Sequence, residues 1–336
     1  MEYIEDGVRL FVADIGGTYA RFAYADASVG AESLTTPIVL ETEDFKTFGD
    51  VVQEALDESG APEINAAAVC GAGPLVQTES GPTIDMTNCP WQLAESELKT
   101  RLGTANVSLV NDFVAIAHAL PLFDDDEFLQ IGGGSADPAG PMAVLGAGTG
   151  LGVAGLVPDG AGQFALIDGE GGHADIAPAN TRELAIYERL LRRFGHVNAE
   201  TILSGAGLEA LHDVLCEMAG LECEPVSAAE ISARAATGGE PISAEAVHCF
   251  TTWLGAAAAN VALTLGATGG VYVAGGIVQR WGGLFETDRF RSRFEDRGKI
   301  GSYTKSIPTY LVTAPDPALK GLVKISEDLL NGKKAS

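Results

Sequence analysis

The chain has 336 residues, of which 21 are Lys or Arg and 46 are Asp or Glu, so its formal net charge at pH 7 is −25. This excess of acidic groups repels a phosphate polyanion unless basic groups are concentrated, so we expect no nucleic-acid partner. The hydrophobic fraction of 46% and the charged fraction of 20% exclude a disordered acidic segment and a charged coiled coil. The length predicts two packed domains that share a cleft.

The N-terminal sequence MEYIEDGVRL is acidic, which is not the pattern of a secretory leader. No uninterrupted apolar run approaches the roughly 18 residues of a membrane-spanning helix, so we expect no contact with a membrane. The five cysteines form an odd set without C-x-x-C spacing. We therefore expect a cytoplasmic protein with reduced thiols, in which Cys70 and Cys249 behave as small buried hydrophobic residues.

The 42 glycines cluster where apolar runs end. The first such run, residues 10–13, stops at Asp14-Ile15-Gly16-Gly17-Thr18, and a second run, 20–25, follows at once. The pattern predicts a β-hairpin, whereas the two common phosphate-binding motifs lead from a strand into a helix and are absent. The tip can still direct backbone amides and the Thr18 hydroxyl at a phosphate, and Asp14 can hold a hydrated divalent cation. An ordinary tight hairpin is the alternative.

The same design recurs at residues 142–157. An apolar run meets a tip formed by Gly148, Thr149 and Gly150 and returns as a second apolar run. Position 151 is Leu, so the alternating glycines do not follow the dinucleotide-binding spacing. Two such hairpins predict two related α/β lobes, each presenting a phosphate-binding tip to a common cleft.

A third junction follows a long alanine-rich segment, residues 244–265, for which we predict a helix. The apolar run 270–274 then ends in Gly275 and Gly276. A nucleoside can lie against such a glycine pair because no side chain intervenes. A tight strand-to-helix turn is the alternative interpretation.

A carboxylate follows another strand-like run, residues 107–110. This run ends at Asn111 and Asp112, and residues 113–120 then form an apolar, helix-like segment that stops at Pro121. One interpretation of Asp112 is the N-cap of that helix. However, the carboxyl end of a strand in an α/β lobe is also where ligands bind, and the two roles are compatible.

Glu170 and His173 lie in a glycine-rich turn with too little apolar sequence around them to belong to a core. Two ligands do not make a zinc site, and no H-E-x-x-H or clustered cysteine pattern accompanies them. A neutral imidazole and an ionised carboxylate are suited instead to hydrogen bonds with sugar hydroxyls. Glu200 can join them, although a solvated helix glutamate is the commoner meaning of such a residue.

Together these motifs resemble the bacterial-type glucokinase family, within the superfamily of sugar kinases, heat-shock ATPases and actin. The resemblance covers almost the entire chain. It departs from the family at Tyr19, at Ala206 and at the segment 317–321, none of which removes a proposed catalytic group. It rests on residues 14–18 with Arg21, 87–88 with 90–91, 110–113, 146–152, 169–173, 204–205, 274–277 and 294–298.

The resemblance implies a glucokinase, which transfers the γ-phosphoryl group of ATP to the 6-hydroxyl of glucose, with Asp112 as the general base. It also implies a homodimer, and Mg²⁺ held by Asp14 through water. The implied glucose-binding residues are Asn111, Asp112, Glu170, His173 and Glu200. The implied ATP-binding residues are Asp14, Gly16, Gly17, Thr18, Gly148, Thr149, Gly150, Ser204, Gly205, Gly275 and Gly276.

The implied fold is α/β, with two lobes whose ribonuclease H-like mixed sheets are flanked by helices and an active site in the interlobe cleft. We expect a small lobe from residues 1–122 and 315–336 and a large lobe from residues 123–314. Three alternatives stay open: a kinase for another hexose, a glucokinase that uses polyphosphate, and a non-catalytic sugar-sensing protein. The last is disfavoured because Asp112, the proposed base, is present.

Overall fold

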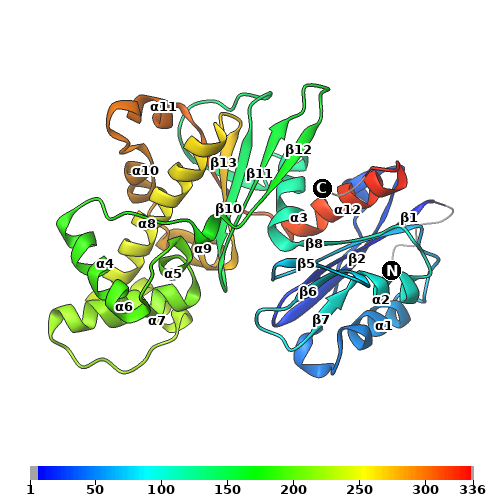
Figure 1. Ribbon diagram of the computed structural model, residues 1–336, viewed down its shortest axis with the longest axis horizontal. Coiled ribbons are helices and arrows are strands. Elements are labelled where there is room, and N and C mark those ends of the chain that lie inside the picture. The colour runs from blue at the N-terminus through cyan, green and yellow to red at the C-terminus, as the bar shows by residue number, and fades with distance from the viewer. Residues whose placement is uncertain (1–6, 334–336) are drawn as a thin grey trace. The chain divides into compact units, whose positions relative to one another are not determined.

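The structure is a computed structural model that describes residues 7–333. The chain forms two compact α/β units (Figure 1). The first contains the described residues up to Asp124 and those from Ala314 onward, and the second runs from Asp125 to Thr313. The backbone therefore passes twice from one unit to the other. Each unit is built on a mixed sheet with helices, which confirms the expected fold class.

The first unit has a five-stranded sheet in the order β3-β2-β1-β4-β8. β1 pairs antiparallel with β2 and parallel with β4, which pairs parallel with β8. The interior strand β4 is buried along its whole length, as expected of an apolar strand covered on both faces. A smaller antiparallel sheet contains β5, β6 and β7. The strands are β1 (Arg9–Ile15), β2 (Tyr19–Asp26), β3 (Ile38–Glu41), β4 (Ala66–Gly71), β5 (Leu75–Thr78), β6 (Gly81–Asp85), β7 (Gln92–Ala94) and β8 (Val107–Asn111).

Helices cover both faces of this sheet. α1 (Phe48–Glu58) and α2 (Glu95–Leu102) bury apolar side chains in one core cluster with β1, β4 and β8. The C-terminal helix α12 (Pro317–Leu330) contacts β1, β4 and α3 (Asp112–Ala119), as Figure 1 shows. Its Gly321 permits this approach, because a Cβ there would lie 1.8 Å from the carbonyl oxygen of Ala115. The end of the chain thus completes the core of the unit that its beginning forms.

The second unit has a six-stranded sheet in the order β12-β11-β10-β13-β14-β9. Its β10–β11 hairpin lies beside β13, which runs parallel to β10, just as the β1–β2 hairpin lies beside β4. Both predicted hairpins are therefore present, in related surroundings. The strands are β9 (Phe128–Gly132), β10 (Met142–Ala147), β11 (Leu151–Pro158), β12 (Phe164–Asp168), β13 (Gly270–Ala274) and β14 (Thr309–Val312).

The core of the second unit is organised around α8 (Pro241–Leu265), the alanine-rich helix predicted from residue 244. Among the described residues, α8 alone is long and apolar enough to cross a membrane, but 67% of its most apolar window is buried inside the protein. That burial is typical of a core helix. The other helices are α4 (Thr181–Phe194), α5 (Ala199–Ile202), α6 (Gly205–Ala219), α7 (Ala228–Ala236), α9 (Gly276–Trp281), α10 (Thr287–Glu295) and α11 (Gly301–Ser306).

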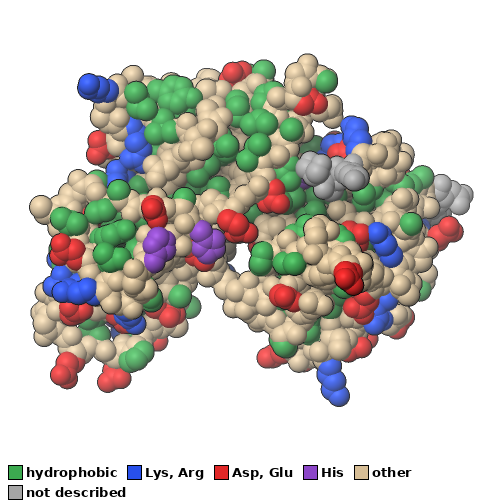
Figure 2. Space-filling view, viewed as in Figure 1, with side chains coloured by type: hydrophobic (Ala, Val, Ile, Leu, Met, Phe, Trp, Pro, Cys, Tyr) green, Lys and Arg blue, Asp and Glu red, His purple; other side chains and the backbone are tan. Residues whose placement is uncertain are grey.

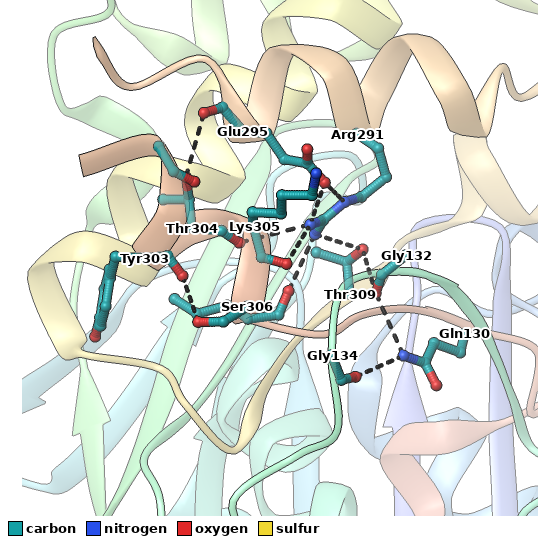
Figure 3. Close-up of polar contacts among 12 residues, drawn as sticks. Gln130, Gly132, Gly134, Arg291, Glu295, Tyr303, Thr304, Lys305, Ser306 and Thr309 are labelled. Carbon is teal, nitrogen blue, oxygen red and sulfur yellow. Dashed lines mark hydrogen bonds and ion pairs between the residues drawn. The ribbon is translucent and has the colours of Figure 1, made fainter. Parts of the chain in front are cut away.

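A buried arginine fastens α10 to the segment that enters β14 (Figure 3). Arg291 donates hydrogen bonds to the carbonyl oxygen of Ile307 at 3.1 Å and to Oγ1 of Thr309 at 3.2 Å. It forms an ion pair with Glu295 at 2.7 Å, and its guanidinium lies 4.7 Å from the ring centroid of Phe294. The charge is thus neutralised and its donors are used inside the unit, which makes its burial tolerable.

The cysteines differ from the expectation of reduced thiols. Cys216 and Cys223 form a disulfide with a Cα–Cα distance of 6.1 Å. Cys70 is buried as predicted, whereas Cys249 is only partly buried. The pairing arises because α6 is followed by Gly220, whose φ of +67° turns the chain back toward the last helical turn. The spacing of the cysteines in the sequence does not predict this turn of the chain.

Acidic side chains are spread over the visible face of both units, with Lys and Arg among them (Figure 2). Several exposed arginines pair with acids, among them Arg182 with Glu245 and Arg193 with Asp213. Such pairs contribute little to stability, but they offset positive charge locally. The net charge of −25 therefore leaves a negative surface.

Candidate functional site

In the first unit, Asp14 lies at the carboxyl end of β1, between Arg21 of β2 and Cys70 of β4 in the strand register. The Cys70 thiol donates a hydrogen bond to Oδ1 of Asp14 at 3.4 Å. Burial raises the pKa of Asp14, and the charge of Arg21 opposes that shift. Arg21 also forms an ion pair with Asp316, just before α12, at 3.0 Å. The carboxyl group of Asp14 is thus bound by the Cys70 thiol of β4 and lies beside the positive charge of Arg21 of β2.

Asn111, rather than Asp112, caps α3. Its Oδ1 accepts from the backbone N–H of Phe113 at 2.8 Å, and its Nδ2 donates to the carbonyl oxygen of Gly73 at 3.1 Å. Asp112 is the first helical residue, with Oδ1 accepting from the same Phe113 N–H at 3.0 Å. The interpretation of Asp112 as the N-cap is therefore wrong. Asn111 is the cap, and it fixes the backbone from which the Asp112 carboxylate projects.

Burial, and then the negative charge of Asp14, raises the pKa of Asp112 to about 7. The hydrogen bond from Phe113 opposes this shift without cancelling it. A carboxylate that takes up a proton near neutral pH has the basicity that general-base catalysis requires. Position and basicity together make Asp112 the strongest candidate for a catalytic group in the first unit.

The β1–β2 tip is a tight turn in which the N–H of Gly16 donates to the carbonyl oxygen of Tyr19 at 2.9 Å. That amide is therefore already used. Thr42 binds the carbonyl oxygens of Gly17 and Thr18 from the end of β3, at 2.8 and 2.9 Å respectively. The side chain of Thr18 is exposed. Of the predicted phosphate contacts at this tip, those from Gly17 and Thr18 fit the geometry better than one from the Gly16 amide.

In the second unit, the β10–β11 tip lies against the start of α6. The N–H of Gly205 donates to the carbonyl oxygen of Gly148 at 2.9 Å, while the hydroxyl of Ser204 caps α6 by accepting from Gly207. The exposed Thr149 therefore lies close to the N-terminus of a 15-residue helix. Helix N-termini attract anions because their amides carry partial positive charge.

The glycine pair after β13 lies beside the β10–β11 tip. Gly275 has a φ of +91°, and a Cβ there would lie 2.5 Å from the carbonyl oxygen of Ala147. Both observations require glycine. The second unit thus brings together the residues predicted to bind a nucleotide there, which are Gly148, Thr149, Gly150, Ser204, Gly205, Gly275 and Gly276.

A pocket of about 300 Å³ opens between α7 and α9, next to this glycine group. Ala228, at the start of α7, would lie 3.9 Å from a Cβ on Gly205. The pocket wall is fixed by a hydrogen bond of 2.8 Å from Nε1 of Trp281 to the Ser232 hydroxyl. Small and flat side chains suit a planar ring. The lining residues are Ala228, Ala229, Ser232, Ala233, Ala236, Ile277, Arg280, Trp281 and Leu284.

The three predicted sugar-binding residues of the second unit also come together. Nε2 of His173 lies 3.8 Å from Oε1 of Glu200 and 4.0 Å from Oε2 of Glu170. Nδ2 of Asn198 lies 3.1 Å from Nδ1 of His173. Because an amide nitrogen can only donate, Nδ1 accepts and the imidazole carries its proton on Nε2, facing the carboxylates. These side chains are arranged to exchange hydrogen bonds with a polyhydroxy ligand.

Glu200 connects this polar group with the glycine tip. Its Oε2 accepts from the N–H of Leu151 at 2.8 Å and would lie 2.4 Å from a Cβ on Gly150. It is therefore not the solvated helix glutamate that the sequence alone leaves open. Within the second unit, the candidate acceptor site and the candidate phosphate site are adjacent.

Comparison with known proteins identifies the family to which the chain belongs. The glucokinase family model matches residues 11–328. The glucokinase of Chromobacterium violaceum is 44% identical over 311 residues, covering 93% of this chain and 87% of the relative. The chain belongs to the glucokinase family. The glucokinase of Nitrobacter hamburgensis is 40% identical, covering 94% of this chain and 96% of the relative. The crystal structure of a glucokinase from an Antarctic psychrotroph has a TM-score of 0.82 at 31% identity, covering 96% of this chain and 99% of that one.

Membership of the glucokinase family confirms the resemblance seen in the sequence and the class of enzyme, an ATP-dependent hexose kinase. The predicted residues divide between the two units. Asp14, Gly16, Gly17, Thr18, Asn111 and Asp112 belong to the first, and the others to the second. Each unit thus carries some of the residues that the sequence predicts for the site.

Three residues that contact the candidate site residues of this glucokinase family member carry no sequence signal for that role. Cys70 contacts Asp14 through the parallel pairing of β1 with β4, a contact that only the sheet register reveals. Asp316 reaches Arg21 from the other end of the chain. Asn198 had a local signal, because Asn198 and Thr201 form a capping box at the start of α5. That signal marks a helix start and does not reveal the contact with His173.

Proposed function

We propose that this chain transfers the γ-phosphoryl group of ATP to the 6-hydroxyl of glucose, with Asp112 as the general base. The observation that carries the proposal is the environment of Asp112, where burial and Asp14 raise the carboxyl pKa to about 7. Phosphoryl transfer has a loose transition state, so the protein mainly positions the groups and a modest base suffices. Asp112 would accept the proton of the 6-hydroxyl as its oxygen meets the γ-phosphorus.

The acceptor would be held from both units. Asn111 and Asp112 would contact glucose from the first unit, and Glu170, His173 and Glu200 from the second. Support comes from the preset hydrogen bonds of Glu200 and His173, which keep these side chains in place before a ligand arrives. Groups that are already oriented lose less entropy when they bind. This set favours a sugar acceptor over an acid.

The donor would lie on the glycine groups, with its purine in the α7–α9 pocket against Gly275 and Gly276. No lysine follows either glycine tip, so the phosphates would be met by backbone amides and by the Thr18 and Thr149 hydroxyls. Bound Mg²⁺ would neutralise phosphate charge. Among the described residues, no group of three or more His, Cys, Asp and Glu side chains is arranged to hold a metal. In this proposal the phosphates would carry the ion, and Asp14 would hold it through water.

The acceptor is tested by measuring ADP release over a panel of hexoses with wild-type protein and Asp112→Asn. We expect the highest kcat/KM with glucose, and a loss of about 10²–10⁴-fold in kcat for the variant because the base is removed. The variant should fold and be more stable than wild type at pH 8, because it no longer buries a charged carboxylate. A variant with near-normal turnover would remove Asp112 from the mechanism, and a preference for mannose or glucosamine would change the acceptor.

The donor pocket is tested by Ala233→Trp, which fills the space between α7 and α9. Glu230→Trp is the matched control, since it adds the same side chain on α7 outside the pocket. We expect the pocket variant to raise KM for ATP about tenfold or more, equivalent to about 1.4 kcal/mol, and to leave KM for glucose unchanged. An unchanged KM for ATP would exclude this pocket. Efficient turnover with polyphosphate, insensitive to Ala233→Trp, would favour the polyphosphate alternative, because that donor has no purine.

We further propose that the protein acts as a homodimer in the cytoplasm. Support for the homodimer comes from the family resemblance, and light scattering on the purified chain measures its mass directly. A monomeric mass across the working concentration range would contradict it.

A further inference from the structure

We propose that Cys216 and Cys223 form a reversible dithiol–disulfide couple that sets the affinity of the donor pocket. The disulfide joins the last turn of α6 to the loop that leads into α7. The predicted function makes no use of these cysteines. The part of the proposal that concerns the donor rests on the proposed purine pocket, whereas the redox couple itself does not.

The disulfide holds a loop that has few other attachments. After Gly220, residues 221–225 are exposed, and the N–H of Leu221 donates to the carbonyl oxygen of Cys216 at 3.0 Å. Val226 then returns to the core with 7% exposure. Between these two points, Cys223 is tied to α6 by its covalent bond. Breaking that bond leaves a short exposed loop that is anchored only at its ends.

This loop leads directly into the start of α7. The hydroxyl of Ser227 caps α7 by accepting from Glu230 at 3.3 Å, and the N–H of Ala228 donates to Oε1 of Glu209 on α6 at 3.0 Å. The first residues of α7, Ala228 and Ala229, already line the α7–α9 pocket. The disulfide therefore lies within a few residues of the wall of the proposed donor pocket, in the loop that leads directly into that wall.

The surroundings of the two sulfurs suit thiol–disulfide exchange. Cys216 is buried, and its Sγ lies 3.9 Å from Nδ1 of His212. Nε2 of His212 lies in turn 3.8 Å from Oε2 of Glu240. An imidazole in this position can take the thiol proton, and the thiolate is the reactive form of cysteine. Cys223, in contrast, lies in the exposed loop, where a small thiol can reach it.

The chemistry balances with a small-molecule thiol as the reductant. Its thiolate attacks Sγ of Cys223, the protein S–S bond breaks, and Cys216 leaves as a thiolate that takes a proton from His212 or water. A second thiolate attacks the mixed disulfide, releasing Cys223 as a thiol and forming the small-molecule disulfide. Two electrons thus pass from two small thiols to the protein disulfide. Oxidation by a small-molecule disulfide is the reverse sequence, in which the Cys216 thiolate attacks Sγ of Cys223.

The oxidised form should bind the donor more tightly. In the reduced form, the loop and the first turn of α7 gain conformational freedom that nucleotide binding must remove again. The acceptor residues Glu170, His173 and Glu200 lie on other segments, so glucose binding should not change. We expect reduction to raise KM for ATP by about three- to tenfold, which corresponds to the cost of ordering about one residue again.

The experiment equilibrates wild-type protein with oxidised or reduced glutathione and measures thiols, KM for ATP and KM for glucose. Three of the five cysteines should titrate in the oxidised protein and all five in the reduced protein. Cys223→Ser should keep the KM for ATP of the reduced form under both conditions. Cys249→Ser, which removes a cysteine outside the couple, should respond to glutathione as wild type does.

Limited proteolysis within residues 221–226 provides a readout that needs no nucleotide, and cleavage should be faster after reduction. Five titrating thiols after treatment with oxidised glutathione, or equal cleavage in both states, would overturn the redox couple. Redox-dependent cleavage with an unchanged KM for ATP, in a protein whose Ala233→Trp variant is impaired for ATP, would overturn the coupling. If Ala233→Trp leaves KM for ATP unaffected, the proposed pocket fails, while the thiol count and proteolysis still decide the couple.

Discussion

At the residue scale, one carboxyl group of the first unit shifts the pKa of another. The negative charge of Asp14 raises the pKa of Asp112. Burial raises the pKa of Asp14 itself, and the positive charge of Arg21 opposes that rise. Asp112 therefore holds a proton at a pH where an ordinary aspartate is fully ionised. For a base that must first be deprotonated, this places activity under pH control.

The pH dependence follows from that environment. Since the pKa of Asp112 is raised to about 7, the active carboxylate form increases with pH through neutrality. We expect kcat/KM for glucose to rise tenfold per pH unit below about pH 7 and to level above it. The measurement is a pH profile at saturating ATP between pH 5.5 and 8.5. A flat profile across this range, in a protein that stays folded, would contradict a base with this pKa.

The sequence pattern places Asp112 directly after a strand, as the structure does. It does not show whether the Asp112 side chain caps the following helix or is available as the proposed general base. The distinction depends on the side chain of Asn111, which takes the capping hydrogen bond and also binds Gly73, 38 positions earlier in the chain. The pKa of Asp112 likewise depends on burial and on Asp14 in another strand. Such effects require the sheet to be assembled, so local patterns cannot supply them.

At the scale of elements, local patterns were sufficient for the hairpins and for α8. An apolar run, a glycine tip and a second apolar run define a hairpin within about twenty residues, so no distant contact is needed. The α7–α9 pocket was missed for the opposite reason, since it depends on how α7 packs, and the alanines of α7 give no sign of which face will line a pocket. The disulfide was missed because it depends on the turn at Gly220, which cysteine spacing does not reveal.

Arg291 provides a test of what holds the elements of the second unit together. Arg291→Met keeps most of the side-chain volume but removes the hydrogen bonds to Ile307 and Thr309 and leaves Glu295 unpaired. We expect a loss of about 3–5 kcal/mol in the free energy of unfolding, because buried partners lose their charge-assisted bonds. Urea denaturation, followed by circular dichroism, measures it.

The control for this prediction lies on the same helix. Arg289→Met breaks a more exposed ion pair, with Glu286, and should cost no more than about 1 kcal/mol. Equal losses for the two variants would mean that the burial of Arg291 contributes nothing beyond a surface ion pair. Both variants should retain the KM for glucose, since neither touches the proposed acceptor residues.

At the scale of the whole molecule, the proposed site is divided between two units that the chain joins by two crossings. The recurrence of the hairpin predicts the two lobes, because two related glycine tips imply two related lobes. A single sugar that contacts both units would favour their approach and would exclude water, which otherwise competes for the phosphoryl group. The charge of −25 poses no obstacle, since backbone amides rather than a basic surface would receive the phosphates.

One matched pair of substitutions tests whether both units bind the sugar. Asn111→Ser, in the first unit, removes the amide but can still cap α3. Glu200→Gln, in the second, keeps the shape of the side chain but removes its charge. If glucose bridges the units, each variant should weaken glucose binding by about 10–100-fold, the value of one or two hydrogen bonds to a ligand. Calorimetry without ATP measures the affinity. Small-angle scattering should show wild-type protein becoming more compact with saturating glucose, and neither variant doing so at the same sugar concentration. If the variant in one unit binds glucose with unchanged affinity, the sugar is bound by the other unit alone. Glucose would then not be expected to make the protein more compact.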